Sequence, residues 1–592
     1  MADSVARGIG HGYQPAIDAA TQIRLLKIFP GAEATKLEGE LFSVDRDQQP
    51  DYHCLSYVWG TGDATELITI SGTPVPIMRN LFAALSHIRS LHHEAVTIWV
   101  DSICINQNDD EEKSTQVAMM KDIYQGCSNC FIWLGQMQRR TGNSTSLTDE
   151  ALADGIVEFL TFLADEDQQD EDLPSSFDQP GALVEVGFAL DAMVSCPWWT
   201  RVWTLQECVA SVKASVLWGP LRMDWQTMLR SSRALIYSPK LKIANEIESS
   251  IYAHSNGFKF TAAVAPLHNA RLGHEETPMD LLWRHSGRHA SNPLDVIYAI
   301  MPLMGEGALA NVRVDYSMDK STLYQVVMRD LILHFGNLKP LVGRTEQTFR
   351  NPDLPNWAID WARVRSEDQM EWWTAGYMFE QFDACFGLPP LDRSEVSAVR
   401  DGPKLRLRGY HLDTVKIHAL PDNHADDPDP ENPGPPWRVR PNMARWHRSI
   451  KANTLKLLSS MDLVGSAPAE KIEELTQAID RAVAGRMISE HIEDPGIRGK
   501  TMRDAWTQDV EPQKVLFVTE TAQFGLGPAN LQLGDEIWIL CGGRVPFLLR
   551  PKAPRTLGND TYSLIGDVYL EDNMWGESVE THKENICEVV IE

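Results

Sequence analysis

The sequence lacks long apolar segments and any excess of positive charge. No run approaches the roughly 20 apolar residues that a membrane-spanning helix needs, and Met1 to Gln22 contains no apolar core of a secretory signal peptide. The net charge is −28, from 54 Lys and Arg against 82 Asp and Glu. Phosphate backbones and anionic lipid surfaces repel such a polyanion. We therefore expect neither a nucleic-acid partner nor a membrane partner.

Short signatures of metal or nucleotide chemistry are also missing. The sequence contains no HExxH zinc motif and no GxSxG nucleophile elbow. Segment Cys127-Ser128-Asn129-Cys130 is a single CxxC without a second pair at zinc spacing. Gly499-Lys500-Thr501 follows Asp494, where a phosphate-binding loop needs its first glycine. We therefore expect no metal and no bound cofactor.

The composition is that of a globular protein with reduced thiols. Hydrophobic residues make up 43% and charged residues 23% of the 592 residues. A chain of this length exceeds one compact core, so we expect two or three domains. The nine cysteines are an odd number in scattered apolar contexts. This usage is typical of a reducing compartment and predicts a cytoplasmic protein.

Strand and helix patterns alternate in the N-terminal part. Short apolar runs predict strands at Ile23–Ile28, Cys54–Trp59, Val96–Val100, Cys130–Gly135 and Ala214–Trp218. A hairpin is expected within Leu67–Ile77, because Ser71-Gly72-Thr73-Pro74 separates two β-like runs. Helical spacing follows at Asn80–Ser90, and Asp109 with Glu112 predicts a capping box at the start of another helix. This alternation predicts an α/β fold with a mainly parallel sheet flanked by helices.

The remaining chain has a different pattern. Residues 227–420 read as a mostly helical region, and 421–441 as a Pro/Asp-rich linker. Residues 442–592 begin with a helical segment and end in a small β-rich module, with strands at Val515–Thr519, Glu536–Leu540, Pro546–Leu549 and Tyr562–Tyr569. The N-terminal domain is accordingly expected to span residues 1–226.

Four ordered segments carry a family resemblance. They are Tyr52–Gly60, Ile98–Gln107, Ile123–Gly135 and Trp199–Glu207. Their order and spacing resemble the heterokaryon-incompatibility (HET) domain of fungal proteins, with a core at residues 23–218. Later pieces, among them Asn292–Ala299 and Leu354–Trp361, resemble what usually follows this domain.

The resemblance implies a role in fungal allorecognition and regulated cell death. It also implies a TIR-like fold, because the HET fold resembles the TIR fold, some members of which cleave NAD. This implication is a fold-level analogy. It makes the protein a candidate NAD+ nucleosidase, for which NAD is a substrate rather than a cofactor.

The residues offer a carboxylate for such chemistry. Cleavage of the nicotinamide–ribose bond passes through an oxocarbenium-like state, which a carboxylate near the ribose stabilises. Glu207 is the first candidate, because it lies in a short, otherwise apolar helix between tryptophan-rich segments. Asp101 is the second, because it follows a central strand at the end where open α/β sheets bind ligands.

Four further residues are candidates for binding the nucleotide. Arg201 could pair with a phosphate, and Trp59 and Trp203 could stack on a base. Ser56, in the strand that leads to Trp59, is included with them.

Each candidate also has a purely structural alternative. Asp101 could cap the turn that follows it, and Glu207 could form a buried pair with Arg201. The tryptophans Trp59, Trp133 and Trp203 could belong to the core. The Ser56 hydroxyl could point at a backbone group.

Two other functions fit the same sequence. The protein could be a non-enzymatic signalling module that triggers death by self-assembly or by binding an incompatibility partner protein, because aromatic-rich segments suit interfaces. It could also be an enzyme of small-molecule metabolism whose C-terminal part supplies a substrate pocket.

Overall fold

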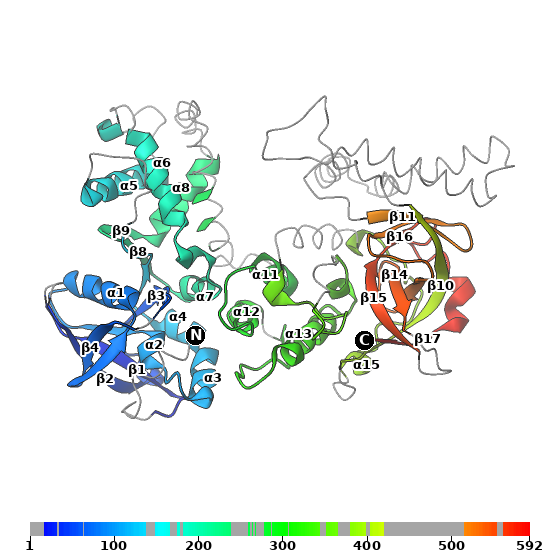
Figure 1. Ribbon diagram of the computed structural model, residues 1–592, viewed down its shortest axis with the longest axis horizontal. Helices are drawn as coiled ribbons and strands as arrows, with labels where there is room; N and C mark the ends of the chain where they lie inside the picture. Colours follow the sequence, from blue (N-terminus) through cyan, green and yellow to red (C-terminus); the bar gives the residue numbers. More distant parts are fainter. Residues whose placement is uncertain are drawn as a thin grey trace. The chain divides into compact units, whose positions relative to one another are not determined.

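A computed structural model of the full chain shows two compact units (Figure 1). The first unit comprises residues 1–305 and 313–318, and the second comprises 306–312 and 319–592. The structure describes residues 17–31, 35–62, 64–137, 148–165, 174–177, 182–237, 259–260, 263–264, 267, 277–285, 287–305, 307–343, 351–364, 379–397, 403–419, 514–552 and 560–592. The predicted linker at 421–441 and the helical pattern at Met443 to Arg486 lie outside these residues.

The first unit contains one nine-stranded sheet in the order β5-β4-β2-β1-β6-β3-β7-β8-β9. The strands are β1 (Gln22–Ile28), β2 (Leu37–Asp45), β3 (His53–Tyr57), β4 (Glu66–Ile70), β5 (Thr73–Ile77), β6 (Val96–Trp99), β7 (Asn129–Trp133), β8 (Ala214–Trp218) and β9 (Leu221–Asp224). Every strand predicted in this part of the chain is present, and the α/β class is confirmed. Strand β2, which carries alternating charged residues, was not predicted.

The sheet is mixed, which corrects the expectation of a mainly parallel sheet. The central strands β6, β3, β7 and β8 are parallel neighbours. Strands β1, β5 and β9 run the other way, because β1 pairs antiparallel with β2 and β6, β5 with β4, and β9 with β8. The connections β1–β2, β4–β5 and β8–β9 are short, and a parallel pairing needs a crossover of a dozen or more residues.

The β4–β5 hairpin confirms the turn prediction. Ser71 and Gly72 form a two-residue turn, and both have positive φ angles of 49° and 83°. This is the conformation of a type I′ turn, which matches the twist of paired strands. Pro74 and Pro76 lie in β5, the outermost strand. Proline offers no N–H to a further strand, so this edge is poorly suited to pairing with another chain.

The first unit also contains helices. They are α1 (Arg79–Ser90), α2 (Asp101–Cys104), α3 (Asp110–Ala118), α4 (Met120–Gly126), α5 (Asp149–Ala164), α6 (Ala182–Val194), α7 (Trp203–Ala210), α8 (Trp225–Tyr237), α11 (Pro278–His285) and α12 (Asp295–Tyr298). Helices α5, α6 and α8 lie together near β8 and β9 (Figure 1). Helix α7 packs against α4, β3 and β7. The sheet strands it contacts are the buried central ones.

The predicted capping box at α3 is formed only in half. The Asp109 carboxylate accepts hydrogen bonds from the backbone N–H groups of Glu111 and Glu112, at 3.1 and 3.0 Å. The Glu112 carboxylate instead accepts two hydrogen bonds from Arg24, at 2.6 and 3.0 Å. The side chain of Arg24 is buried, and a buried guanidinium needs a carboxylate partner. The Glu112 carboxylate also accepts the Asn106 N–H at 2.8 Å, and the Asp109 N–H donates to Asn106 O at 3.2 Å, so both groups of the missing half have other partners.

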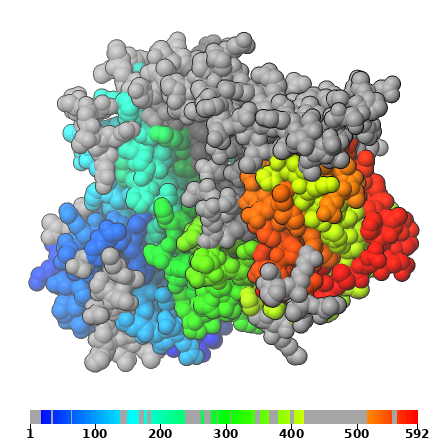
Figure 2. Space-filling view, turned by 45° about the vertical axis from the view of Figure 1, so that its right-hand side comes forward, coloured from blue at the N-terminus to red at the C-terminus, as the bar shows by residue number. Residues whose placement is uncertain are grey.

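The second unit is built around a sheet of eight strands, in the order β13-β14-β15-β17-β10-β11-β12-β16. The strands are β10 (Leu405–Ala419), β11 (Lys514–Thr519), β12 (Phe524–Pro528), β13 (Glu536–Leu540), β14 (Phe547–Pro551), β15 (Thr561–Asp567), β16 (Tyr569–Leu570) and β17 (Cys587–Ile591). An additional β13–β10 pairing closes five of them into a ring. The predicted C-terminal β-rich module is confirmed, and Figure 2 shows its surface in orange to red beside the yellow-green of β10. Strand β10 itself was not predicted.

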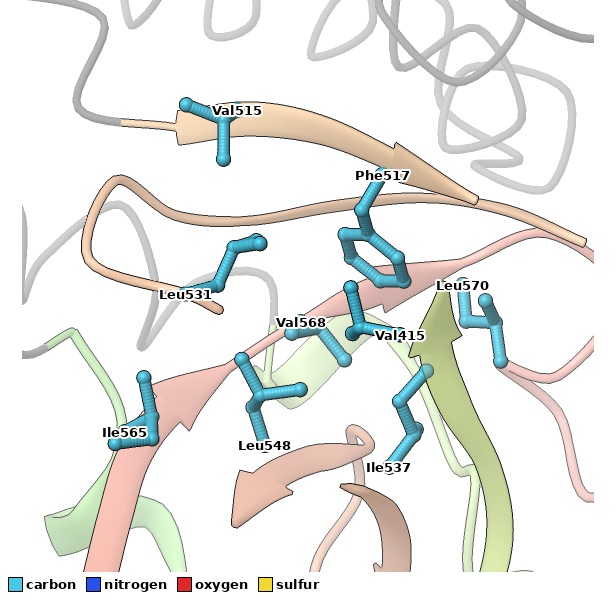
Figure 3. Close-up of a cluster of buried hydrophobic side chains, with 9 residues drawn as sticks. All are labelled: Val415, Val515, Phe517, Leu531, Ile537, Leu548, Ile565, Val568 and Leu570. Carbon is cyan, nitrogen blue, oxygen red and sulfur yellow. The ribbon is translucent and has the colours of Figure 1, made fainter. Parts of the chain in front are cut away.

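The core of this module draws on strands that are far apart in sequence. Nine buried side chains from these strands and their connections point toward one another (Figure 3): Val415, Val515, Phe517, Leu531, Ile537, Leu548, Ile565, Val568 and Leu570. Burial of such side chains supplies the main favourable free energy of folding. Helices α13 (Lys320–Phe335) and α15 (Arg393–Ser397) also belong to this unit, and α15 packs against α13 and β10. Among the described residues, no helix combines the length and the apolar character needed to cross a membrane.

Candidate functional site

The site candidates meet at the carboxyl ends of β3 and β6. These strands are parallel neighbours, so the residues that follow them emerge at the same edge of the sheet. Trp59 follows β3, and its indole N–H donates a hydrogen bond to Asp101 Oδ2 at 2.8 Å. Asp101 begins α2 directly after β6, and its Oδ1 accepts the backbone N–H of Ser102 at 2.7 Å. Asp101 therefore caps the turn that follows it, which is the structural role proposed for it as an alternative. It also contacts Trp59, a second candidate residue.

Helix α7 brings Glu207 against β3. The Ser56 hydroxyl donates a hydrogen bond to the Glu207 carboxylate. The Trp198 indole N–H donates in turn to Ser56 Oγ at 2.8 Å. Ser56 and Trp198 are 0% exposed and Glu207 is 2% exposed. The Ser56 hydroxyl thus contacts a carboxylate and not the backbone group that its structural alternative required.

Burial sets the protonation of Glu207. Loss of hydration raises the pKa of this carboxyl to about 7, opposed by the positive charge of Arg201 and by the Ser56 hydrogen bond. The negative charge of Asp101 raises the pKa further. A carboxyl with a pKa near neutral can both hold and release a proton under physiological conditions. Within the described residues, Arg201 acts on Glu207 through space and not through a direct ion pair.

Arg201 is held by the backbone around it. Its guanidinium donates a hydrogen bond to the carbonyl oxygen of Tyr57, the last residue of β3. The two residues that flank Arg201 in the chain both bond to the backbone of His289. The His289 N–H donates to Thr200 O at 2.6 Å, and the Val202 N–H donates to His289 O at 3.0 Å. The positive charge of Arg201 lowers the pKa of both Asp101 and Glu207. Arg201 therefore lies in the field of both candidate carboxyls.

Asp101 occupies a less buried position than Glu207. Its side chain is partly exposed. Burial raises the pKa of its carboxyl, while Arg201 and the hydrogen bonds from Trp59 and Ser102 lower it. Of the two candidate carboxyl residues, Asp101 is therefore the one with more of its surface exposed.

Asp295 is a third carboxyl near the site, and the sequence analysis missed it. It begins α12, and its Oδ1 accepts the Tyr316 hydroxyl at 2.8 Å. The positive charges of Lys113 and Arg201 act on it and lower its pKa. Burial is the largest influence and raises its pKa. An acid between Leu294 and Val296 is the same signal that singled out Glu207, an acid in an apolar stretch.

The candidates fall into two groups by exposure. Ser56, Glu207 and Trp198 are buried, whereas Trp59, Asp101, Arg201, Trp203 and Asp295 are half-buried. Trp133 is fully buried and belongs to the core, as its structural alternative proposed. Trp59 and Trp203 keep part of their surface accessible, as a wall of a binding site requires. In the part of the chain that the structure describes, no three His, Cys, Asp or Glu side chains are grouped to hold a metal ion.

Two family models match this chain. Residues 52–207 match the family described as heterokaryon incompatibility protein (HET), and residues 496–587 match the Het-6 beta-barrel domain. The first match contains all four segments on which the resemblance rested. It begins at Tyr52 and ends at Glu207, so it includes Ser56, Trp59 and Asp101 but not Asp295.

A relative extends the likeness over almost the whole chain. The protein is 24% identical to heterokaryon incompatibility protein 6, OR allele, of Neurospora crassa, over 98% of this chain and 98% of the relative. No solved structure matches the chain. The first unit thus carries a match to the HET family and the second a match to the Het-6 beta-barrel domain, and the chain as a whole resembles a fungal heterokaryon incompatibility protein.

Proposed function

We propose that this protein acts in fungal heterokaryon incompatibility as an effector of regulated cell death. The two family matches and the name of the Neurospora relative support this role. A cytoplasmic location is part of the proposal. None of the nine cysteines is in a disulfide in the structure, which is compatible with a reducing compartment.

The effector acts, in this proposal, by cleaving NAD+ at the nicotinamide N-glycosidic bond. The observation that carries the proposal is Glu207, a buried carboxyl with a pKa of about 7 beside Ser56. Perturbed carboxyls of this kind are concentrated at functional sites. The TIR-like relationship of the fold remains an additional prediction, supported by the sequence resemblance alone.

The chemistry requires one bond to break and one to form. The C–N bond between ribose and nicotinamide breaks, and its electron pair stays on the ring nitrogen, so neutral nicotinamide leaves. Positive charge develops on the ribose and is stabilised by a carboxylate. Water then forms the new C–O bond and loses a proton. Asp101, which is partly exposed, is suited to face the ribose, and Glu207 is suited to accept the proton.

The burial of Glu207 adds a condition to this mechanism. Because Glu207 is 2% exposed, the side chains around it have to move before it can contact a substrate or a water molecule. A cell-death effector has to be silent until it is triggered, and a covered carboxyl fits such a resting state. Activity is therefore expected to depend on a trigger, such as self-assembly at high protein concentration or an incompatibility partner.

The charges around Arg201 favour an orientation of NAD+ in which the nicotinamide ring, and not the diphosphate, lies near the candidate site. The guanidinium already binds the Tyr57 carbonyl, and the three carboxyls of Asp101, Glu207 and Asp295 are within reach of its field. Its positive charge is therefore largely balanced. We expect the cationic nicotinamide ring to lie near the tryptophans and the diphosphate to lie farther from Arg201.

A nicotinamide-release assay on the full chain tests the proposal. The wild type should release nicotinamide from NAD+ at high protein concentration, and Glu207→Gln, which keeps the size of the side chain, should reduce release at least a hundredfold. Glu158→Gln is the matched control, because Glu158 accepts a hydrogen bond from Ser176 on the surface as Glu207 does from Ser56 in the interior. A fully active Glu207→Gln variant would contradict the assignment.

The non-enzymatic function predicts a different result. If the protein kills by assembly or by binding a partner, expression in a fungal host should remain toxic after the combined change Asp101→Asn and Glu207→Gln. Loss of toxicity in this double variant, with normal folding, supports the enzymatic function.

A further inference from the structure

Arg288 is held by the backbone that leads into α7. Its Nη1 donates to Trp199 O at 2.8 Å and to Arg201 O at 3.3 Å. The backbone bridge between Arg201 and His289 anchors the chain at the next position. The Arg288 guanidinium is therefore fixed beside the segment that carries the candidate Arg201.

The other edge of this guanidinium is open. Arginine has five N–H donors, and Nη1 directs its own at the two carbonyls. Within the part of the chain that the structure describes, Nε and Nη2 of Arg288 have no hydrogen-bond partner, and neither nitrogen is fully buried. In Arg550 the same two nitrogens bind both carboxylate oxygens of Asp535, at 2.7 and 2.8 Å. Arg288 thus presents a pair of donors that fits a carboxylate or a phosphate group.

No carboxylate of the described residues forms an ion pair with Arg288, although the chain has 82 Asp and Glu against 54 Lys and Arg. The buried Arg24, in contrast, is paired with Glu112. Arg288 is half-buried, and the loss of hydration lowers its pKa to about 10, so the side chain stays protonated at neutral pH. A cation with reduced hydration and no counter-charge is costly, and a bound anion would offset that cost.

The positive field of Arg288 is visible at its neighbour His285, which is 1% exposed. Burial, followed by the charges of Arg288 and Arg284, holds the pKa of His285 well below its usual value, so the ring is neutral. Around Arg201 the charge is instead balanced by three carboxyls. An anionic part of a substrate is therefore better placed at Arg288 than at Arg201.

The position of Arg288 suits one part of NAD+. The nicotinamide and the diphosphate of NAD+ lie on opposite sides of one ribose, so the group that binds the diphosphate has to lie near the site carboxyls without being paired with them. Arg288 meets both conditions, because it binds the carbonyl of Arg201 and no carboxyl among the described residues. Trp203, which could stack on the nicotinamide ring, begins α7 two positions after that carbonyl.

We propose that Arg288 binds the diphosphate of NAD+ through Nε and Nη2, and that it thereby selects substrates that carry a diphosphate. The inference rests on the proposed function, which supplies the substrate. It places a specificity-determining residue beyond the HET match, which ends at residue 207.

Arg288→Gln in the full chain tests this with two substrates. Nicotinamide riboside has the same scissile bond as NAD+ but no diphosphate. The variant should raise the KM for NAD+ about tenfold with little change in kcat, and should leave the KM for nicotinamide riboside unchanged, because only NAD+ loses a charge-assisted contact. A purely structural role would raise both KM values by the same factor, and that result would overturn the inference.

Arg46→Gln is the matched control for this experiment. It also removes one positive charge, but from a guanidinium that is already paired with Asp122 at 3.1 Å. Both KM values should equal those of the wild type in this variant.

Binding of ADP-ribose gives a second readout that does not depend on catalysis. ADP-ribose has the diphosphate and lacks the nicotinamide. In calorimetric titrations of the full chain, Arg288→Gln should raise the Kd for ADP-ribose about tenfold, and Arg46→Gln should not change it. If the wild type releases no nicotinamide, the proposed function fails while this titration still decides the role of Arg288.

Two results of the titration would overturn the inference: no binding of ADP-ribose to the wild type, or the same Kd in wild type and Arg288→Gln. If Arg288→Gln fails to fold, Arg288→Lys decides the question. Lysine keeps the charge but cannot bind two phosphate oxygens with a rigid pair of donors, so the Kd should rise. An unchanged Kd in Arg288→Lys would then count against the proposed contact.

Discussion

The Ser56 hydroxyl donates its hydrogen bond to the carboxylate of Glu207, a residue 151 positions later in the chain. The contact joins the central strand β3 to helix α7 inside the first unit. It is completely buried, and the Trp198 indole supplies the next hydrogen bond in the chain of donors. Buried polar groups of this kind need hydrogen-bond partners. A substitution of Ser56, Trp198 or Glu207 is therefore expected to disturb the hydrogen bonds of the other two residues.

Removal of the Ser56 hydroxyl should move the pH dependence of NAD+ cleavage. The Ser56 hydrogen bond lowers the pKa of Glu207, so Ser56→Ala should raise that pKa above its present value of about 7. If ionised Glu207 is the active form, the acidic limb of the pH–rate profile moves to higher pH and the rate at pH 7 falls. Nicotinamide release measured from pH 5 to pH 9 checks this. Ser176→Ala, on the surface, should leave the profile unchanged, and an unmoved profile in Ser56→Ala would count against a role for Glu207.

Glu207→Gln should make the protein more stable at alkaline pH relative to the wild type. The pKa of Glu207 is about 7 in the folded chain and near 4.5 in the unfolded chain. The unfolded state therefore releases this proton first, so stability is fully present below about pH 4.5 and is lost as the pH rises to 7. The loss amounts to about 3 kcal/mol at 1.36 kcal/mol per pKa unit. Melting temperatures at pH 5 and pH 8 should differ less in Glu207→Gln than in wild type, and an equal difference in both proteins would show that Glu207 is not buried in its neutral form.

Arg201→Gln should distinguish two roles of this side chain, a charge that balances the nearby carboxyls and a group that binds the diphosphate. As a balancing charge, Arg201 lowers the pKa of both Asp101 and Glu207, so its loss raises both pKa values whichever substrate is bound. The KM values for NAD+ and for nicotinamide riboside, which has no diphosphate, should then change by the same factor. A rise in KM for NAD+ alone would show instead that Arg201 binds the diphosphate, as the sequence suggested.

The buried pair of Arg24 and Glu112 should matter more than a similar pair on the surface. Glu112→Gln leaves the buried Arg24 guanidinium without its carboxylate and should cost about 3 kcal/mol of unfolding free energy. Glu40→Gln breaks an exposed pair with Lys27 at 3.7 Å and should cost less than about 1 kcal/mol. Urea unfolding of the two variants provides the comparison. Equal costs would show that solvent reaches Arg24.

The sequence by itself determined the local elements and the family resemblance. The apolar run Ala214–Trp218 is a strand with those same bounds, and Ser71-Gly72 forms the predicted turn. These features depend on neighbours in the chain, through burial of a continuous apolar run and through the φ angles that Ser and Gly adopt. The four segments that identify the HET domain are equally visible without coordinates.

Only the tertiary structure decided strand direction and the contacts of the site. Strands β2 and β10 were not predicted, although β10 alternates apolar and polar residues at Leu405–Arg408 and at Val415–His418, which is a local strand signal. The antiparallel pairings that make the first sheet mixed also depend on which strands become neighbours. Ser56 meets Glu207, and Trp59 meets Asp101, through folding of segments that are distant in sequence. No local pattern encodes such a meeting, because it depends on the packing of α7 against β3 and on the pairing of β3 with β6 in the folded unit.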